Sequence, residues 1–190
     1  MHNLEHFDKI NYIDIFSLYE LEELCNRLHK SSNFSKHDIP ASVHCTPSSI
    51  PIPPPSVSPD YKDVYNRLGE ASIEINRKHF NYDIRGNTYI RLFFESNEMQ
   101  NVNLYDWNVS APTSDISNDK KITVIVPLSD SNNYSGGELE VCLDQGKNSI
   151  IKVKQHPGTG IFFPSTASFR FTPVTSGQKR ILFFECTGLS

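Results

Sequence analysis

The sequence predicts a mainly β protein, a double-sheet jelly roll of about eight strands preceded by two helices. Short segments rich in β-branched and aromatic residues recur through the second half of the chain. Clusters of Asn, Asp, Ser, Gly or Pro separate these segments, and no helical periodicity lies between them. Consecutive strands without intervening helices are typical of an antiparallel jelly roll.

Length and composition set the limits of this prediction. The chain has 190 residues with 37% apolar and 11% aromatic content, enough for one globular domain with a sizeable core. A formal net charge of -4 offers no basic surface, so we expect no nucleic-acid partner. The sequence lacks an apolar run of the roughly 18 residues that a membrane span needs.

Two features bear on where the protein works. The first residues lack the basic and apolar regions of a secretory signal. The four cysteines are scattered without a CxxC pair, which is typical of reduced thiols. We therefore expect an intracellular, cytoplasmic protein or a component of a virus particle.

Residues 1–30 are expected to form a strand and a helix that pack on the barrel. The extended piece covers residues 11–16, and Ser17 and Glu20 then have the spacing of a capping box. Apolar residues recur at helical intervals after this cap, at Leu18, Leu21, Leu24, Cys25 and Leu28. One face of this helix is therefore predicted to be buried.

Residues 31–59 differ in composition from the rest of the chain. Seven prolines lie among serines, and residues 50–55 predict an extended polyproline II segment. A connection this long is unusual inside a compact domain, and a loose surface loop is the alternative to a segment that is held in place. We expect protein partners or a second copy of the chain to bind through the N-terminal and Pro-rich segments.

The third region, residues 60–190, is expected to hold a helix and then the strands. Ser58 and Pro59 are suited to the N-cap and first position of a helix that runs to Phe80, interrupted in propensity by Gly69. The predicted strands cover residues 88–94, 101–107, 120–127, 137–143, 150–154, 160–163, 168–172 and 180–186.

Four fragments point to a known family. They are residues 105–110, Tyr-Asp-Trp-Asn-Val-Ser; residues 134–140, Tyr-Ser-Gly-Gly-Glu-Leu-Glu; residues 163–175, which begin Phe-Pro-Ser; and residues 177–180, Gly-Gln-Lys-Arg. In order and spacing they resemble the prolyl-4-hydroxylase-like (PKHD-type) branch of the iron(II)/2-oxoglutarate dioxygenases. The resemblance covers residues 60–187 well and residues 10–30 faintly. It implies a double-stranded β-helix, which is the jelly roll that the strand pattern predicts independently.

The resemblance also implies a degenerate metal site. The two histidines and one carboxylate that bind iron in the family correspond here to Asn108, Ser110 and Phe169. An amide and a hydroxyl are poor ligands for iron(II), and a phenyl ring is none. We therefore expect no metal ligands, no catalytic residues and no cofactor, with the Phe169 ring filling the former metal position and stabilising the barrel.

The favoured hypothesis is a pseudoenzyme, a dioxygenase-fold module with a structural or protein-binding role in a larger assembly such as a virion. The alternative is an active iron(II)/2-oxoglutarate-dependent hydroxylase whose unconventional metal site uses Asp106, Asp115 and His156. These three residues are more simply explained as turn or strand-end side chains.

Arg180 is the residue that, by resemblance, pairs with the distal carboxylate of 2-oxoglutarate. A bidentate guanidinium suits a carboxylate, so Arg180 is a candidate for a vestigial cosubstrate site and for a metal-free dicarboxylate sensor. An exposed or internally paired arginine is the alternative. Gly136 and Gly137 are expected to form a tight turn that needs positive φ.

Overall fold

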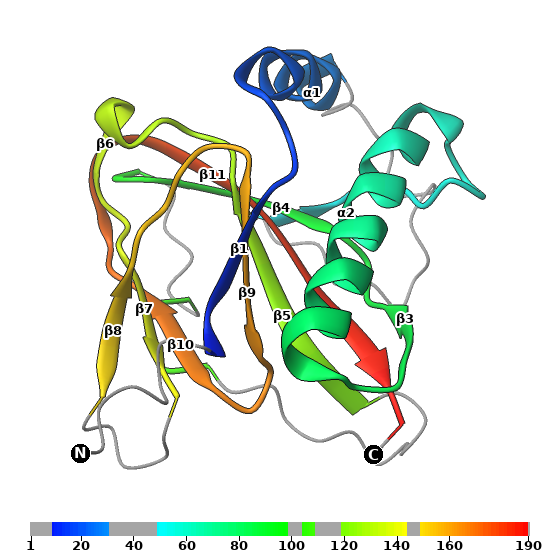
Figure 1. Ribbon diagram of the computed structural model, residues 1–190. Helices are drawn as coiled ribbons and strands as arrows, with labels where there is room; N and C mark the ends of the chain where they lie inside the picture. The colour runs from blue at the N-terminus through cyan, green and yellow to red at the C-terminus, as the bar shows by residue number, and fades with distance from the viewer. Residues whose placement is uncertain (1–8, 31–48, 99–103, 109–118, 144–148, 190) are drawn as a thin grey trace.

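The computed structural model describes residues 9–30, 49–98, 104–108, 119–143 and 149–189, which form two sheets and two α-helices (Figure 1). The larger sheet is eight-stranded, with the order β1-β9-β5-β11-β4-β2, and β3 and β6 also pair with β11. Its strands are β1 (Asn11–Asp14), β2 (Ser49–Pro51), β3 (Ile84–Asn87), β4 (Arg91–Ser96), β5 (Asp119–Pro127), β6 (Tyr134–Gly136), β9 (Thr159–Pro164) and β11 (Val174–Gly188).

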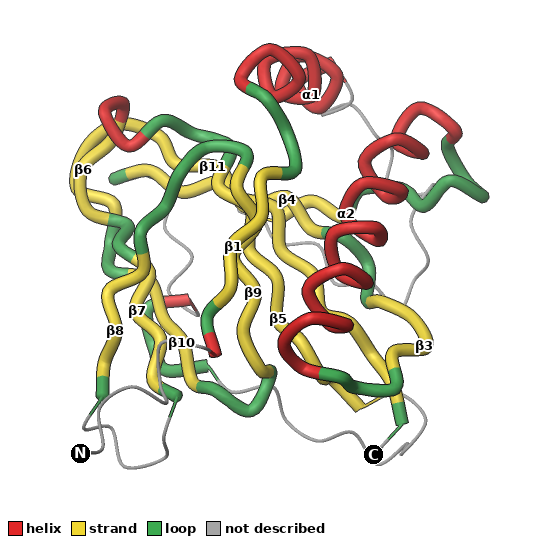
Figure 2. Tube along the Cα trace, in the orientation of Figure 1, coloured by secondary structure: helices red, strands yellow, loops and turns green. Residues whose placement is uncertain are grey.

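The smaller sheet faces one end of the larger one. It has three antiparallel strands in the order β10-β7-β8, formed by β7 (Leu139–Cys142), β8 (Ile150–Val153) and β10 (Ser168–Phe171). Figure 2 shows these strands on one side of the larger sheet and both helices on the other. The arrangement confirms the predicted mainly β jelly roll with two helices.

The helices begin as the sequence indicates, with one exception. In α1 (Leu18–Lys30) the Ser17 backbone donates to Glu20 Oε2 at 2.8 Å, and the Glu20 backbone donates to Ser17 Oγ at 3.3 Å, so the capping box is present. Before α2 (Lys62–Ile75), Pro59 opens a 3₁₀ turn that leads into the helix. Ser58 is the N-cap residue of this turn and Pro59 its first residue, as predicted, although the Ser58 side chain makes no capping hydrogen bond.

Helix α2 ends in a wider, π-helical turn, Asn76–Phe80. Asn81 follows in the left-handed region, with φ of 56°. A short polar residue tolerates this conformation and ends the helix. The chain then enters the sheet at β3.

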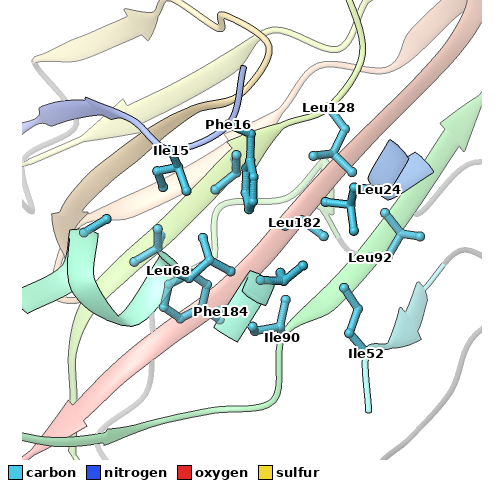
Figure 3. Packing of buried hydrophobic residues seen from close by; sticks show 14 of the residues in the cluster. Ile15, Phe16, Leu24, Ile52, Leu68, Ile90, Leu92, Leu128, Leu182 and Phe184 are labelled. Carbon is cyan, nitrogen blue, oxygen red and sulfur yellow. The ribbon is translucent and has the colours of Figure 1, made fainter. Parts of the chain in front are cut away.

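The two faces of the larger sheet bury separate hydrophobic clusters, because neighbouring residues of a strand point to opposite faces. Leu182 and Phe184 of β11 pack with the helices, together with Leu24 of α1 and Leu68 of α2 (Figure 3). Ile181 lies on the other face, in the cluster between the two sheets. We call the space that this second cluster occupies the barrel interior.

Both edges of the larger sheet come from the N-terminal third of the chain. Strand β1 pairs with β9, and β2 pairs with β4. The end of the Pro-rich segment is therefore part of the sheet, and Ile52 beside it is buried. The expectation that residues 50–55 form only a polyproline II insert outside the barrel is corrected accordingly, while residues 31–48 lie outside the described part of the chain.

One predicted strand is wrong in its described half. Residues 104–107 form turns, and residues 101–103 fall outside the described ranges. The Asn108 side chain donates to the Asp106 carbonyl at 2.8 Å. Local hydrogen bonds of this kind compete with strand pairing, and only Asn108 itself pairs with a neighbouring strand.

Two further observations concern the helices and the thiols. Neither described helix is both long enough and apolar enough to span a bilayer. The described cysteines, Cys25, Cys142 and Cys186, form no disulfide with one another.

Candidate functional site in the barrel interior

Asn108 and Phe169 are neighbours in the barrel wall and are paired through their backbones. The Asn108 N–H donates to the Phe169 carbonyl at 2.8 Å, and the Phe169 N–H donates to the Asn108 carbonyl at 2.9 Å. Directly opposed residues of this kind have Cα atoms about 5.5 Å apart and project their side chains to the same face. Two of the three positions singled out by the family resemblance are thus adjacent in space, while Ser110 lies outside the described residues.

Phe169 is part of the apolar core between the two sheets, with 4% of its surface exposed. Its ring lies 5.7 Å from that of Phe163 and 5.9 Å from that of Phe183, measured between centroids. Burial of a side chain of this size contributes about 1.5 to 3 kcal/mol. The ring therefore fills the barrel interior at the position where the resemblance placed a metal ligand.

Arg180 lies on the opposite face of β11 from Phe169's cluster. Arg180 and Leu182 are two residues apart on β11, so their side chains point to the same face of the sheet, the face that packs on the helices. The Arg180 guanidinium lies 5.9 Å from the centroid of the Phe94 ring on that side. The guanidinium also donates to Gln178 Oε1 at 2.7 Å. Arg180 therefore points away from the barrel interior.

The cation that enters the barrel is the neighbouring Lys179, which is 1% exposed. Its Nζ donates to the Gly137 carbonyl at 2.5 Å and lies 3.7 Å from the centroid of the Phe171 ring. Sequence reasoning missed Lys179, although the alternation of β11 contained the signal. Because Ile181 and Lys179 are two residues apart, they must share a face.

Glu95 of β4 lies directly opposite Lys179. The sequence did not indicate Glu95 as a site residue either. It is 2% exposed, on the same face as Phe93 of the interior cluster. Burial raises the pKa of the Glu95 carboxyl, and the nearby Lys179 charge acts in the opposite sense. Burial lowers the pKa of Lys179 to about 7, and the Glu95 charge opposes this shift.

Arg170 makes two contacts on the outer face of the smaller sheet. Arg170 Nε donates to Glu140 Oε2 at 2.8 Å, and the guanidinium lies 4.7 Å from the centroid of the Trp107 ring. The charge-assisted hydrogen bond and the cation–π contact connect β10, β7 and the turn before Asn108. This contact helps to position Asn108 opposite Phe169.

The arrangement of the two sheets can be compared with known proteins. No family model and no curated protein sequence matches the chain. Solved structures do match, among them a prolyl-4-hydroxylase from Pseudomonas putida with a TM-score of 0.68, 12% identity, and coverage of 96% of this chain and 94% of that one. A truncated viral collagen prolyl hydroxylase from Paramecium bursaria chlorella virus-1 matches with a TM-score of 0.64 at 16% identity, over 95% of this chain and 91% of that one.

A third match is a Trichoplax adhaerens prolyl hydroxylase in complex with a hypoxia-inducible factor peptide fragment. Its TM-score is 0.65 at 14% identity, over 98% of this chain and 86% of that one. The chain has the fold of the 2-oxoglutarate/iron(II) dioxygenases. At these identities the comparison establishes the dioxygenase fold alone, and the PKHD-type branch stays a prediction.

The described residues of this dioxygenase fold do not fit an iron(II) site. Asn108 uses its amide nitrogen to hold the Asp106 carbonyl, and Phe169 offers no donor atom. Within the described ranges, no three His, Cys, Asp or Glu side chains gather in a group that could hold a metal ion. Non-haem iron(II) sites of this kind need two imidazoles and a carboxylate on one face, a set that these residues do not supply.

The three residues considered for a relocated metal site, Asp106, Asp115 and His156, are not brought together by the described part of the chain. Asp106 and His156 are both exposed, and the His156 carbonyl accepts from the Thr159 N–H at 3.1 Å within a turn. Asp115 lies outside the described part of the chain. The predicted turn at Gly136 and Gly137 is confirmed, with φ values of 76° and 63°.

A separate groove of about 430 Å³ lies on the helix side, between α2 and β3. Its polar side chains are engaged by groups within the chain. Asn76 donates to the Tyr82 carbonyl, Ser72 donates to the Leu68 carbonyl, and Arg85 pairs with Asp83. Phe184 is part of both the groove lining and the helix-side core, so the groove is distinct from the barrel interior.

Proposed function

We propose that this protein is a non-catalytic dioxygenase-fold module that serves a structural or protein-binding role within a larger assembly such as a virus particle. The observation that carries the proposal is the Phe169 ring, which packs among other aromatic rings between the sheets, opposite Asn108. A site that must bind a metal, a dicarboxylate and oxygen needs open, polar positions. Here the corresponding space is filled by an apolar side chain that stabilises the fold.

Turnover assays test the catalytic half of the proposal. The purified chain is incubated with iron(II), ascorbate and 2-oxoglutarate, and succinate is measured alongside metal retained after equilibrium dialysis. We expect succinate at the level of the protein-free control and no retained iron. Iron-dependent succinate formation would overturn the proposal and favour an active hydroxylase with an unconventional metal site.

The N-terminal segment supports the binding half of the proposal. Leu18 and Tyr19, in the first turn of α1, are 72% and 71% exposed. Tyr12 of β1, at the edge of the larger sheet, is 46% exposed. Exposed apolar and aromatic side chains at a sheet edge are typical of protein contact surfaces.

The other sheet edge is less suited to this role. Strand β2 ends at Pro51, and proline cannot donate a hydrogen bond to an added strand. We therefore place the proposed contact on the N-terminal segment, and we take a second copy of the chain as its first candidate partner.

Sedimentation velocity tests this contact over a range of protein concentrations. We expect the native chain to self-associate and the variant Leu18→Asp/Tyr19→Asp to remain monomeric. Acidic residues are favourable in the first turn of a helix, so the substitutions preserve α1. A native chain that stays monomeric at all concentrations would refute self-association and leave only a different protein as the partner.

A further inference from the structure

Strand β1 forms one edge of the larger sheet. Within the described ranges it pairs with β9 on one side and with no strand on the other. An edge of this kind presents backbone N–H and C=O groups that can pair with another chain. Strand β1 contains no proline, whereas β2 at the opposite edge ends at Pro51. The edge at β1 is therefore the one suited to backbone pairing.

The neighbouring ladder shows which groups of β9 are directed toward β1. The Ser165 N–H donates to the Lys121 carbonyl at 3.0 Å, in register with the pairing of β9 and β5. Alternate residues of an antiparallel strand bond to opposite neighbours. Because Ser165 bonds toward β5, Gly160 and Phe162 bond toward β1.

The backbone groups on the outer side of β1 follow from this alternation. Asn11 and Ile13 lie opposite the two β9 residues that bond toward β1. Ile15 continues the alternation, since its N–H donates to the carbonyl just before β9 at 2.9 Å. The N–H and C=O groups of Tyr12 and Asp14 therefore point away from the sheet. Both residues are exposed, so these groups are accessible to another chain.

One register allows two copies of this edge to satisfy each other. If two β1 strands run antiparallel with Tyr12 of one copy opposite Asp14 of the other, every outward N–H of these residues meets an outward carbonyl. A two-fold axis then passes between the two Ile13 residues, so the contact is self-complementary. A register with Asp14 opposite Asp14 would place like charges together, which destabilises a strand pair.

Charge also favours a second copy as the partner. Lys9 is exposed just before β1, and Glu22 and Glu23 are exposed in α1, just after it. Antiparallel pairing brings the start of each strand beside the end of the other, so basic and acidic residues meet at both ends. The Asp14 carboxylate accepts a hydrogen bond from the Thr159 hydroxyl at 2.7 Å within its own copy.

We propose that two copies of this chain associate through β1, so that their larger sheets join edge to edge with Tyr12 of each copy opposite Asp14 of the other. The inference rests on the proposed function and deepens it, because it narrows the contact from the N-terminal segment to the backbone of one strand. The exposed Leu18 and Tyr19 side chains lie at the ends of this contact, close to where β1 leads into α1.

Disulfide trapping tests the register. Tyr12→Cys and Asp14→Cys chains are purified separately, mixed and oxidised. The disulfide is located by peptide mass spectrometry, because the chain has four native cysteines. Directly opposed residues lie about 5.5 Å apart at Cα, within the range that a disulfide spans. We expect the mixed sample to form a cross-link between position 12 of one chain and position 14 of the other.

Each variant alone is the matched control. In the proposed register two Tyr12→Cys residues, or two Asp14→Cys residues, are displaced along the strands and lie about 8 Å apart at Cα, too far for a disulfide. The separate samples should therefore not cross-link at these positions. Equal trapping in the mixed and separate samples, or trapping in one variant alone, would overturn the proposal.

A second measurement removes one outward donor. Asp14→Pro lacks the N–H that would bond to the second copy, and since this group does not point toward β9, the strand keeps its place in the sheet. Asp14→Ala keeps the N–H and is the matched control. Sedimentation velocity should show self-association about tenfold weaker in Asp14→Pro than in Asp14→Ala, because the two-fold axis removes the donor twice.

The outcomes separate this inference from the proposed function. If the native chain self-associates but Asp14→Pro and Asp14→Ala have equal dissociation constants, pairing through β1 is refuted while the wider contact on the N-terminal segment stands. A native chain that remains monomeric refutes self-association by any route, and this inference with it. Iron-dependent succinate formation would overturn the non-catalytic role and leave the pairing of β1 untouched.

Discussion

Asn108 and Phe169 exchange both backbone hydrogen bonds, at 2.8 and 2.9 Å, as an isolated antiparallel pair. The pair joins the turn that contains Trp107 to β10 of the smaller sheet. One member contributes an aromatic ring to the interior core, and the other uses its amide locally. The backbone geometry that would bring two ligand side chains together is present, while the side chains themselves are not ligands.

Truncation of Phe169 should destabilise the fold. We expect Phe169→Ala to lower the free energy of unfolding by about 3 to 5 kcal/mol, because it leaves a cavity among Phe163, Phe171 and Phe183. Urea unfolding measures the change. Tyr19→Ala, at an exposed position, should change it by less than about 0.5 kcal/mol, and a similar loss in both variants would contradict the packing role of Phe169.

Restoring ligands should restore metal binding if the family correspondence is right. The variant Asn108→His/Ser110→Asp/Phe169→His places two imidazoles on directly opposed residues, about 5.5 Å apart at Cα, close enough to share one ion. We expect visible cobalt(II) absorption from this variant and none from the native chain. Asn108→His/Ser110→Asp, which keeps Phe169, is the matched control. Absorption from the native chain would show that other residues bind the metal.

The stability of the protein should depend on pH through Lys179. Burial lowers the pKa of Lys179 from its ordinary 10.5 to about 7, so between these values the unfolded chain binds more protons than the folded one. A rise in pH through this window therefore favours the folded state, by at most about 1.4 kcal/mol per pH unit. Glu95 acts on the acid side, because its raised pKa makes the folded state lose stability as pH rises above 4.5.

Comparison with Lys179→Met isolates the lysine from the other groups. Tyr105 and Tyr134, which also respond to the Glu95 charge, titrate at higher pH, as does the buried Cys186 thiol. We expect the native chain to gain stability between pH about 7 and 8.5 relative to Lys179→Met, measured by urea unfolding. Parallel pH profiles for the two proteins would show that Lys179 does not titrate in this range.

The Arg170 contact should be visible in the fluorescence of the single tryptophan, Trp107. Arg170→Met removes the guanidinium from the indole ring and from the largely buried Glu140 carboxylate. We expect a shift in emission and a loss of about 1 to 3 kcal/mol in the free energy of unfolding. Lys152→Met breaks the exposed pair with Glu138, which solvent screens, and should have a much smaller effect on unfolding. Unchanged emission in Arg170→Met would refute the contact.

The sequence predicted most of the regular structure, because local patterns carry that information. The capping box of Ser17 and Glu20 predicted where α1 begins, and the β-branched and aromatic residues of β5 and β9 predicted strands. The turn at residues 104–107 was predicted as a strand, since its composition gave no sign that Asn108 would hold the Asp106 carbonyl. Strand β2 was missed because only its pairing with β4 makes Ser49–Pro51 a strand.

By itself, the sequence determined that Asn108, Ser110 and Phe169 bring no iron ligands to the places where the resemblance expected them, because side-chain identity fixes donor chemistry. Only the tertiary structure decided which cation enters the barrel. Arg180 and Lys179 are adjacent in the chain and both carry basic side chains, but strand alternation directs Arg180 to the helix side and Lys179 to the interior. The same structure brought Glu95 opposite Lys179 from 84 positions earlier in the chain, a pairing set by the register of β4 and β11.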